Sequence, residues 1–238
     1  MQLGKAMPHT LLAGQIAAMA SIVPLVMYGN WWQWLICSIM YFNIVCLGIS
    51  VGYHRLLSHR SFKCPKWLEY LFVWFGHIMM VGPVALWVAT HREHHKYTDT
   101  DKDPHSPKHK GYFYAHFLQV YTFPKLKYMT DVLRNPIYKL EHKYYWELIA
   151  LWAIIIYLID PFALIYAWLA PAGFAKIIGS LVFSYSHRNG KPNSDFLVGV
   201  ITGGEGFHTA HHEKPYITLW HPWDIGGRII RLVDKNAT

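Results

Sequence analysis

Histidine is the residue type in this sequence whose number and spacing most clearly indicate chemistry. The chain contains 16 histidines, and eight of them lie in three short clusters: His54-Arg-Leu-Leu-Ser-His59, His91-Arg-Glu-His94-His95 and His208-Thr-Ala-His211-His212. In the second and third clusters the histidines occupy positions i, i+3 and i+4, which share one face of a helix. Positions i+3 and i+4 diverge by about 100° around the axis, so one helix can supply ligands to two adjacent metal ions. The i, i+5 spacing of the first cluster requires a helix end or a local distortion.

These clusters indicate a particular kind of metal site. A structural zinc site uses four ligands, and its usual ligand sets include cysteine, whereas imidazole also suits iron and copper. Eight clustered histidines without a thiolate therefore predict two non-haem iron ions that activate O2. The three cysteines, Cys37, Cys46 and Cys64, match neither a metal motif nor a disulfide framework and are interpreted as packing residues.

Four apolar segments must position the clusters. Residues 11–29, 33–53, 146–159 and 162–183 are each close to the length that crosses a hydrocarbon core of ~30 Å, and short turns join them into two helical hairpins. Only 15% of the residues are charged, and the 11 Trp and 16 Tyr suit the aromatic belts that flank membrane spans. The sequence therefore predicts an all-α integral membrane fold, a single domain over residues 1–238, with four transmembrane helices and cytosolic histidine-bearing helices.

Residues 68–89 are long enough for a further span, but a crossing there would separate the first two histidine clusters. If these clusters share a metal centre, the segment must form an interfacial or re-entrant helix, with Gly82-Pro83 as its break. Fourteen of the 22 Lys and Arg lie in residues 54–145 and six in residues 184–238, so the positive-inside tendency predicts a cytoplasmic metal centre and cytoplasmic termini. Lys176, inside the last span, is expected to snorkel or to face the bundle interior.

Histidines outside the clusters have simpler interpretations. His77 lies in an apolar segment and is expected to pack or to form a hydrogen bond. The remaining histidines without a motif are expected at the surface or the interface: His9, His109, His116, His142 and His221. A histidine-rich metal transporter is a different class of protein, and it would place its ligands near the bilayer midplane. Here the clusters lie at the span ends, which favours an enzyme.

The sequence around the clusters resembles the three histidine boxes of membrane fatty acyl desaturases, and it is most similar to the stearoyl-CoA (Δ9) branch. The second box is the most specific, because the run His-His-Lys-Tyr-Thr-Asp-Thr-Asp-Lys-Asp-Pro-His105 continues well past the ligands. The resemblance covers roughly residues 30 to 223, and it implies four spans, two iron ions, O2 as co-substrate and a CoA- or lipid-linked acyl chain. It also implies a ninth ligand, so that the expected metal ligands are His54, His59, His91, His94, His95, His187, His208, His211 and His212.

Two positions depart from the family pattern. Phe183 stands where the family has an asparagine that holds a metal-bound water, and Thr209-Ala210 fills the middle of the third box. Acidic side chains near the boxes are expected to hold imidazole N–H groups, with solvated turn residues as the alternative interpretation. These acids are Asp99, Asp101, Asp103 and Glu205. His105 resembles a family residue outside the ligand set, and the second span from Phe42 to Ile49 is expected to line an acyl tunnel or to pack in the core.

The nearest alternative function is a histidine-box hydroxylase, ketolase or alkane oxygenase, which would share the metal chemistry but insert oxygen. The continuation of the second box favours desaturation. We recognise no haem-binding or ferredoxin-like segment, so the electron donor is expected to be a separate protein such as ferredoxin or cytochrome b5. The net charge of +8 would attract an acidic carrier and is not taken to indicate nucleic acid. The short segment after Trp223 favours a bacterial inner membrane over the endoplasmic reticulum.

Overall fold

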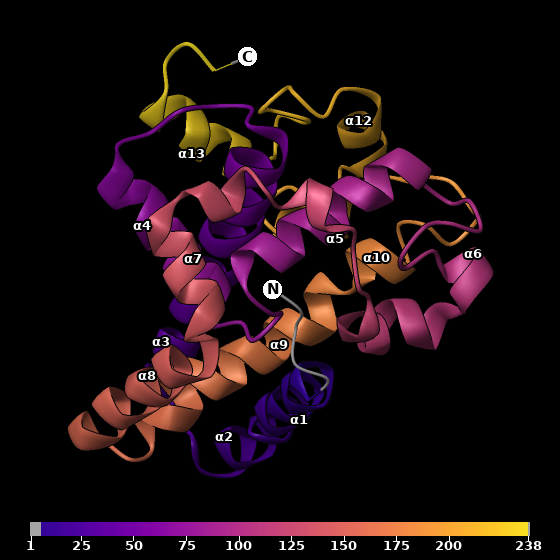
Figure 1. Cartoon of the computed structure of the whole chain (residues 1–238). Coiled ribbons are helices and arrows are strands. Elements are labelled where there is room, and N and C mark those ends of the chain that lie inside the picture. The colour runs from indigo at the N-terminus through magenta and orange to yellow at the C-terminus, as the bar shows by residue number, and fades with distance from the viewer. Residues whose placement is uncertain (1–5, 238) are drawn as a thin grey trace.

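A computed structural model describes residues 6–237, and every regular element within them is helical, as predicted. Figure 1 shows two regions: α1 (Met7–Ala20), α2 (Ile22–Tyr28), α3 (Trp31–Phe42), α8 (Tyr145–Ile159) and α9 (Ala170–Gly179) lie together at the bottom of the view. Above them lie α5 (Val84–Tyr97), α12 (His208–Glu213) and α13 (Ile225–Val233). The other short elements of the chain are α6 (Pro107–Lys110), η2 (Tyr114–Leu118), η3 (Gln119–Tyr121), η4 (Leu126–Tyr128), η5 (Val132–Arg134), α7 (Pro136–Lys143) and α11 (Phe196–Ile201).

Three helical runs are long and apolar enough to cross a membrane: Met7–Tyr28, Trp31–His59 and Leu164–Ser184. They consist of α1 (Met7–Ala20) with α2 (Ile22–Tyr28), α3 (Trp31–Phe42) with η1 (Asn43–His59), and η6 (Leu164–Leu169) with α9 (Ala170–Gly179) and α10 (Leu181–Ser184). The fourth expected span is α8 (Tyr145–Ile159), which is an apolar helix of only 15 residues. The four-span topology therefore stays a prediction.

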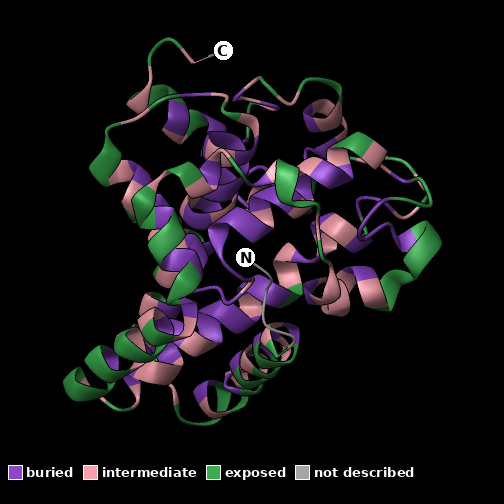
Figure 2. Cartoon of the chain, viewed as in Figure 1, coloured by how far each residue is buried: buried purple, intermediate pink, exposed green. Residues whose placement is uncertain are grey.

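The outer surface of this helical region is apolar. Large side chains such as Leu158 and Ile159 are 77% and 79% exposed, and exposed residues line the outside of α8 and α1 in Figure 2. An exposed apolar surface of this kind is costly in water but ordinary against lipid tails. Inside, α1 and α9 approach closely, because a side chain at Gly173 would meet the Ala18 carbonyl oxygen at 2.4 Å. The helices thus pack through small residues and present apolar side chains outward.

The ambiguous segment 68–89 turns back on itself. It forms α4 (Lys66–His77) and α5 (Val84–Tyr97), which are joined by a turn in which Met80 and Gly82 have φ of 60° and 98°. The helix breaks at Gly82-Pro83, as expected if the first two histidine clusters share a metal centre, and α5 begins directly after Pro83. Both α4 and α5 pack on η1. This turn brings the second histidine cluster back to the end of the second span, where the first cluster lies.

A buried carboxylate holds the turn between α4 and α5. Glu141, from α7, lies 2.8 Å from His77 Nδ1 and accepts a hydrogen bond from the Val84 backbone N–H at 3.3 Å. Burial raises the pKa of Glu141, although the hydrogen bond to His77 opposes that shift. His77 thus has the hydrogen-bonding role expected of it, and Glu141 connects the end of α4 to the start of α5.

Replacing Glu141 with leucine should lower the free energy of unfolding by about 1–3 kcal/mol, because His77 and the Val84 N–H lose a buried partner. Thermal unfolding in detergent, followed by tryptophan fluorescence, measures this change. Glu147→Gln is the matched control, because Glu147 is exposed in α8 and should tolerate the change. Equal melting temperatures for Glu141→Leu and the control would contradict the proposed role of Glu141.

Candidate metal centre

The nine histidines expected as ligands come together from four places in the chain: η1, α5, the segment after α10, and α12. They form two groups, and within each group the ring nitrogens lie within 4.8 Å of one another. The first group contains His54, His59, His91, His95 and His211, and the second contains His94, His187, His208 and His212. Each HxxHH helix contributes to both groups, which agrees with the divergence of positions i+3 and i+4 around a helix.

The unusual spacing of the first cluster is explained by the helix type of η1. Asn43–His59 is π-helical, and its hydrogen bonds run from residue i to i+5. Residues five apart therefore share one face, and the rings of His54 and His59 have centroids 4.9 Å apart. Arg60, with φ of 55°, ends the helix. The sequence predicted a distortion here, but it placed the end of this span near residue 53, whereas the helix continues to His59.

Within each group, the Nε2 atoms of the rings face one another. In the first group His211 Nε2 lies 2.8 Å from His95 Nε2 and 3.1 Å from His54 Nε2, and His59 Nε2 lies 2.9 Å from His91 Nε2. In the second group His208 Nε2 lies 2.8 Å from His187 Nε2 and 3.1 Å from His212 Nε2. His94 Nε2 lies 3.4 Å from His212 Nε2. The same ring atom therefore points inward in all nine side chains.

Acceptors behind the rings determine which nitrogen carries the proton. His54 Nδ1 lies 2.5 Å from Glu205, His94 Nδ1 lies 2.9 Å from Asp103, and His187 Nδ1 lies 2.7 Å from Asp99. Because an ionised carboxylate only accepts, these three rings carry their proton on Nδ1 and direct an Nε2 lone pair inward. Converging lone pairs repel one another unless a cation lies between them, so this donor set fits metal ions. Asp101 is exposed, and within residues 6–237 no hydrogen bond joins it to a histidine.

Five of these rings are also uncharged near neutral pH. Burial, together with the neighbouring imidazoles, holds the pKa of His91, His94, His208 and His211 well below the usual range. The same causes lower the pKa of His95 to about 3. Neutral imidazole is the form that binds metal, so the fold itself prepares these side chains as ligands.

A buried ionic network lies behind the first group. Arg55 is fully buried, and its guanidinium lies 2.8 Å from Asp224 and 3.5 Å from Glu205, while it stacks 3.5 Å from the Trp220 ring. Burial alone would raise the pKa of Glu205, but pairing with His54 and Arg55 lowers it. We did not anticipate Arg55, Asp224 or Trp220 from the sequence. An arginine between two histidines expected as ligands on one helix was the available signal, since it needs a buried counter-ion.

A second ionic link fastens α5 to the end of η1. Asp131 pairs with Arg60 and lies 2.7 Å from Arg92, which also donates to the Leu57 carbonyl at 2.8 Å. Partial burial opposes ionisation of Asp131, but the hydrogen bonds from Arg92 and Arg60 dominate and lower its pKa to about 2.

Because this pKa is depressed, the stabilisation from Asp131 is complete above the ordinary carboxyl pKa of about 4 and is lost as the pH falls toward 2. Asp131→Asn should therefore melt below the wild-type chain at pH 6, and the gap should narrow at pH 3. Melting temperatures of both chains at the two pH values test this. A difference in melting temperature that stays constant between pH 6 and pH 3 would argue against stabilisation by the ionised Asp131 carboxylate.

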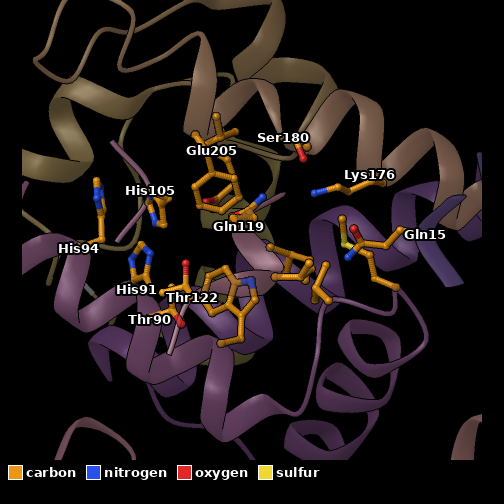
Figure 3. Close-up of a pocket in the computed structure, with 18 of the residues that line it drawn as sticks. Gln15, Thr90, His91, His94, His105, Gln119, Thr122, Lys176, Ser180 and Glu205 are labelled. Atoms are coloured by element: carbon orange, nitrogen blue, oxygen red, sulfur yellow. The ribbon is translucent and has the colours of Figure 1, made fainter. Parts of the chain in front are cut away.

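An apolar cavity adjoins the histidines. Its lining includes His91, His94 and His208 at one end and residues of α1, η1, α5 and α9 along its length, and the close-up in Figure 3 shows the histidine end opposite Gln15 and Lys176. Val45 and Ile49, within the segment expected as a tunnel wall, line it. Phe183, at the position of the family asparagine, also faces this cavity.

The remaining histidines lie outside the two groups. His105 is buried beside them, stacked on His94 with ring centroids 4.4 Å apart, and its ring contacts Phe183 at 4.9 Å. His9 and His109 are exposed, and His116 and His221 are half-buried. The expectation for His142 was wrong, because α7 buries it. Its pKa is correspondingly lowered by burial.

The fold and the site together define a class: a helical protein of membrane type whose converging imidazoles open onto an apolar cavity. The chain belongs to the fatty acid desaturase family, whose model matches residues 29–223, and it is an oxidoreductase. It is 32% identical to the Delta-9 acyl-lipid desaturase 1 of Arabidopsis thaliana over 226 residues, which are 85% of this chain and 73% of the relative.

Two further relatives are named for different double-bond positions. The sn-1 stearoyl-lipid 9-desaturase of Anabaena variabilis is 34% identical over 189 residues, covering 71% of this chain and 67% of that protein. The Acyl-CoA C20 Delta5-desaturase of Anemone leveillei is 29% identical over 246 residues, covering 95% and 78%. Relatives thus share the family while their names differ in acyl carrier and double-bond position.

Proposed function

We propose that this chain is an O2-dependent fatty acyl desaturase that introduces a cis double bond at Δ9 into a saturated, CoA- or lipid-linked acyl chain. Two iron ions would be held by the nine histidines, five in the first group and four in the second. The observation that carries the proposal is the meeting of these two groups with one end of an apolar cavity. The Δ9 position is supported by two of the relatives described above.

When bound, the iron ions would supply the activation of O2, which no side chain can provide. Overall, O2 takes up the two hydrogen atoms that leave adjacent carbons of the acyl chain, together with two electrons from a donor and two protons from solvent, and becomes two molecules of water. The protein's part is positioning and exclusion of water. Glu205, Asp99 and Asp103 keep the proton of their histidines on Nδ1, so that Nε2 stays available. Val45, Ile49 and Trp87 give the acyl chain an apolar wall.

We also propose the membrane arrangement that the sequence predicts. Both termini and the metal centre would face the cytoplasm, and a separate carrier such as ferredoxin or cytochrome b5 would deliver electrons there. The apolar outer surface around α8 and α1 supports a membrane location. A bacterial inner membrane remains our proposal for the particular membrane.

Fatty-acid analysis of a host that expresses the chain tests the function. Lipids are derivatised at double bonds and examined by gas chromatography–mass spectrometry, beside the double variant His94→Ala/His211→Ala. We expect a new monounsaturated acid, with the bond nine carbons from the carboxyl end, that is absent from the variant. A hydroxy or keto product would replace desaturation with oxygen insertion at the same site, and a purified chain without iron would overturn the proposal altogether.

A further inference from the structure

The end of the cavity away from the histidines is closed and polar. Lys176, on α9, and Gln15, on α1, are each 1% exposed, and both line the cavity. The Gln15 amide nitrogen donates a hydrogen bond to the Met80 carbonyl at 3.0 Å, which leaves its Oε1 without a partner, and the Lys176 Nζ also has none. Figure 3 shows both side chains reaching into the cavity opposite His91 and His94. One unpaired donor and one unpaired acceptor therefore lie at the closed end of an apolar space.

A buried lysine without a partner carries a large cost. Within residues 6–237 no carboxylate pairs with Lys176, and its charge acts on His116, another base. Ionisable side chains inside membrane helices are rare because burying an unpaired cation is expensive, so they mark functional positions. Methionine at this position would fill the same space without that cost. The lysine therefore needs a partner that comes from outside the chain.

The small space at this end limits what the partner is. Because Lys176 and Gln15 are almost completely buried, neither CoA nor the glycerol of a lipid fits beside them. The head of the acyl substrate and its carrier therefore lie outside the cavity, beyond the histidines, and the tail of the acyl chain points to the closed end. The group that reaches Lys176 is the last carbon of that tail, with whatever small substituent it carries.

We propose that this cavity selects acyl chains that carry a hydroxyl group on their last carbon, and that Lys176 and Gln15 bind this ω-hydroxyl. The inference rests on the proposed function and specifies the substrate class of the same site. A hydroxyl is both an acceptor and a donor of hydrogen bonds. Its oxygen accepts from the Lys176 ammonium and its O–H donates to Gln15 Oε1, so one small group satisfies both unpaired atoms. A methyl end satisfies neither.

The length of the helix agrees with such a tail. Lys176 and Phe183 both line the cavity, and Phe183 contacts His105, which stacks on His94. Seven residues of helix separate Lys176 from Phe183 by about 10 Å, the length of roughly eight carbon–carbon bonds in an extended chain. An acyl chain of about 18 carbons that reacts at Δ9 has this length between its double bond and its last carbon. Stearate and ω-hydroxystearate are therefore the pair to compare.

Stabilisation by bound ligand, measured without reductant and hence without turnover, tests the ω-hydroxyl site. Purified chain in detergent is melted with methyl stearate, methyl ω-hydroxystearate or methyl 12-hydroxystearate, and the dependence of the melting temperature on ligand concentration gives each affinity. We expect the ω-hydroxy ester to bind about tenfold more tightly than methyl stearate, because two buried polar atoms gain partners. The 12-hydroxy ester, whose hydroxyl lies along the apolar length of the cavity, should bind no better than methyl stearate.

Two lysine variants show whether the preference comes from Lys176. Lys176→Met should lose the advantage of the ω-hydroxy ester but still bind methyl stearate, and it should melt at or above the wild-type temperature because it lacks the unpaired buried cation. Lys139→Met, at an exposed lysine of α7, is the matched control and should keep the preference. Equal stabilisation of the wild type by the two esters, or none by either, would overturn the proposal, since water would then serve both polar groups. A preference that survives Lys176→Met would overturn it as well.

Failure of the ω-hydroxyl site and failure of the proposed function are separable. A host that expresses the chain is fed stearic and ω-hydroxystearic acids in equal amounts, and we expect the larger unsaturated fraction in the ω-hydroxy acid. Lys176→Met should reverse this order while its iron content stays unchanged. A wild-type chain that prefers the ω-hydroxy ester in the melting assay but yields no unsaturated acid would refute desaturation alone. A chain that desaturates both acids equally and shows no preference in the melting assay would refute the ω-hydroxyl site alone.

Discussion

Purified His211→Ala should hold about one iron per chain instead of two, and its desaturated product should fall by about a hundredfold or more. His211 Nε2 faces His54 and His95 at 3.1 and 2.8 Å, so its loss opens the first group at its centre. His212→Ala, one residue away, should empty the second group instead, because His212 faces His94 and His208. Iron analysis and Mössbauer spectra of the two variants measure this difference.

The matched control is His9→Ala, which removes an exposed histidine of α1 outside both groups and should leave iron and product unchanged. His211 and His212 are adjacent in the sequence but belong to different groups. The iron that remains should therefore be the one held by the second group in His211→Ala and by the first group in His212→Ala, and the two spectra should differ. Two irons and normal product in either variant would show that the converging nitrogens are not the ligand set.

The second large effect is expected from Arg55→Met, which should lower the free energy of unfolding by about 3–5 kcal/mol. Arg55 and Asp224 are both fully buried and lie 2.8 Å apart, and Glu205 is the second carboxylate on the same guanidinium. Removing the arginine leaves two buried anions without their shared cation. Unfolding in mixed detergent micelles, followed by tryptophan fluorescence, gives the change.

A double-mutant cycle separates the ion pair from the loss of packing against Trp220. Arg55→Met/Asp224→Asn should recover part of the lost stability, because it removes one of the stranded charges. Iron binding by the first group of histidines should recover only in part in this double variant, because Glu205, which contacts His54, still lacks the arginine beside it. A double variant no more stable than Arg55→Met would mean that packing, rather than charge, accounts for the effect.

Much of this protein follows from spacing within short segments. Three apolar runs, two HxxHH motifs and the break at Gly82-Pro83 were readable in the sequence, because helical periodicity and glycine–proline stereochemistry act over a few residues. The i+3 and i+4 positions already implied that each HxxHH helix serves two ions. The resemblance to the desaturase boxes added His187, which no spacing rule would have selected.

Only the tertiary structure decided which histidines form one group and what lies behind them. His94 and His95 are adjacent in sequence yet face different groups, and Asp103 holds a ring nitrogen while Asp101 points to solvent. The counter-ions of Arg55 and the place of Lys176 in the cavity depend on contacts between segments more than a hundred residues apart. Local propensities decide how a segment folds, but the packing of distant segments decides which atoms meet, and a metal centre is made by that meeting.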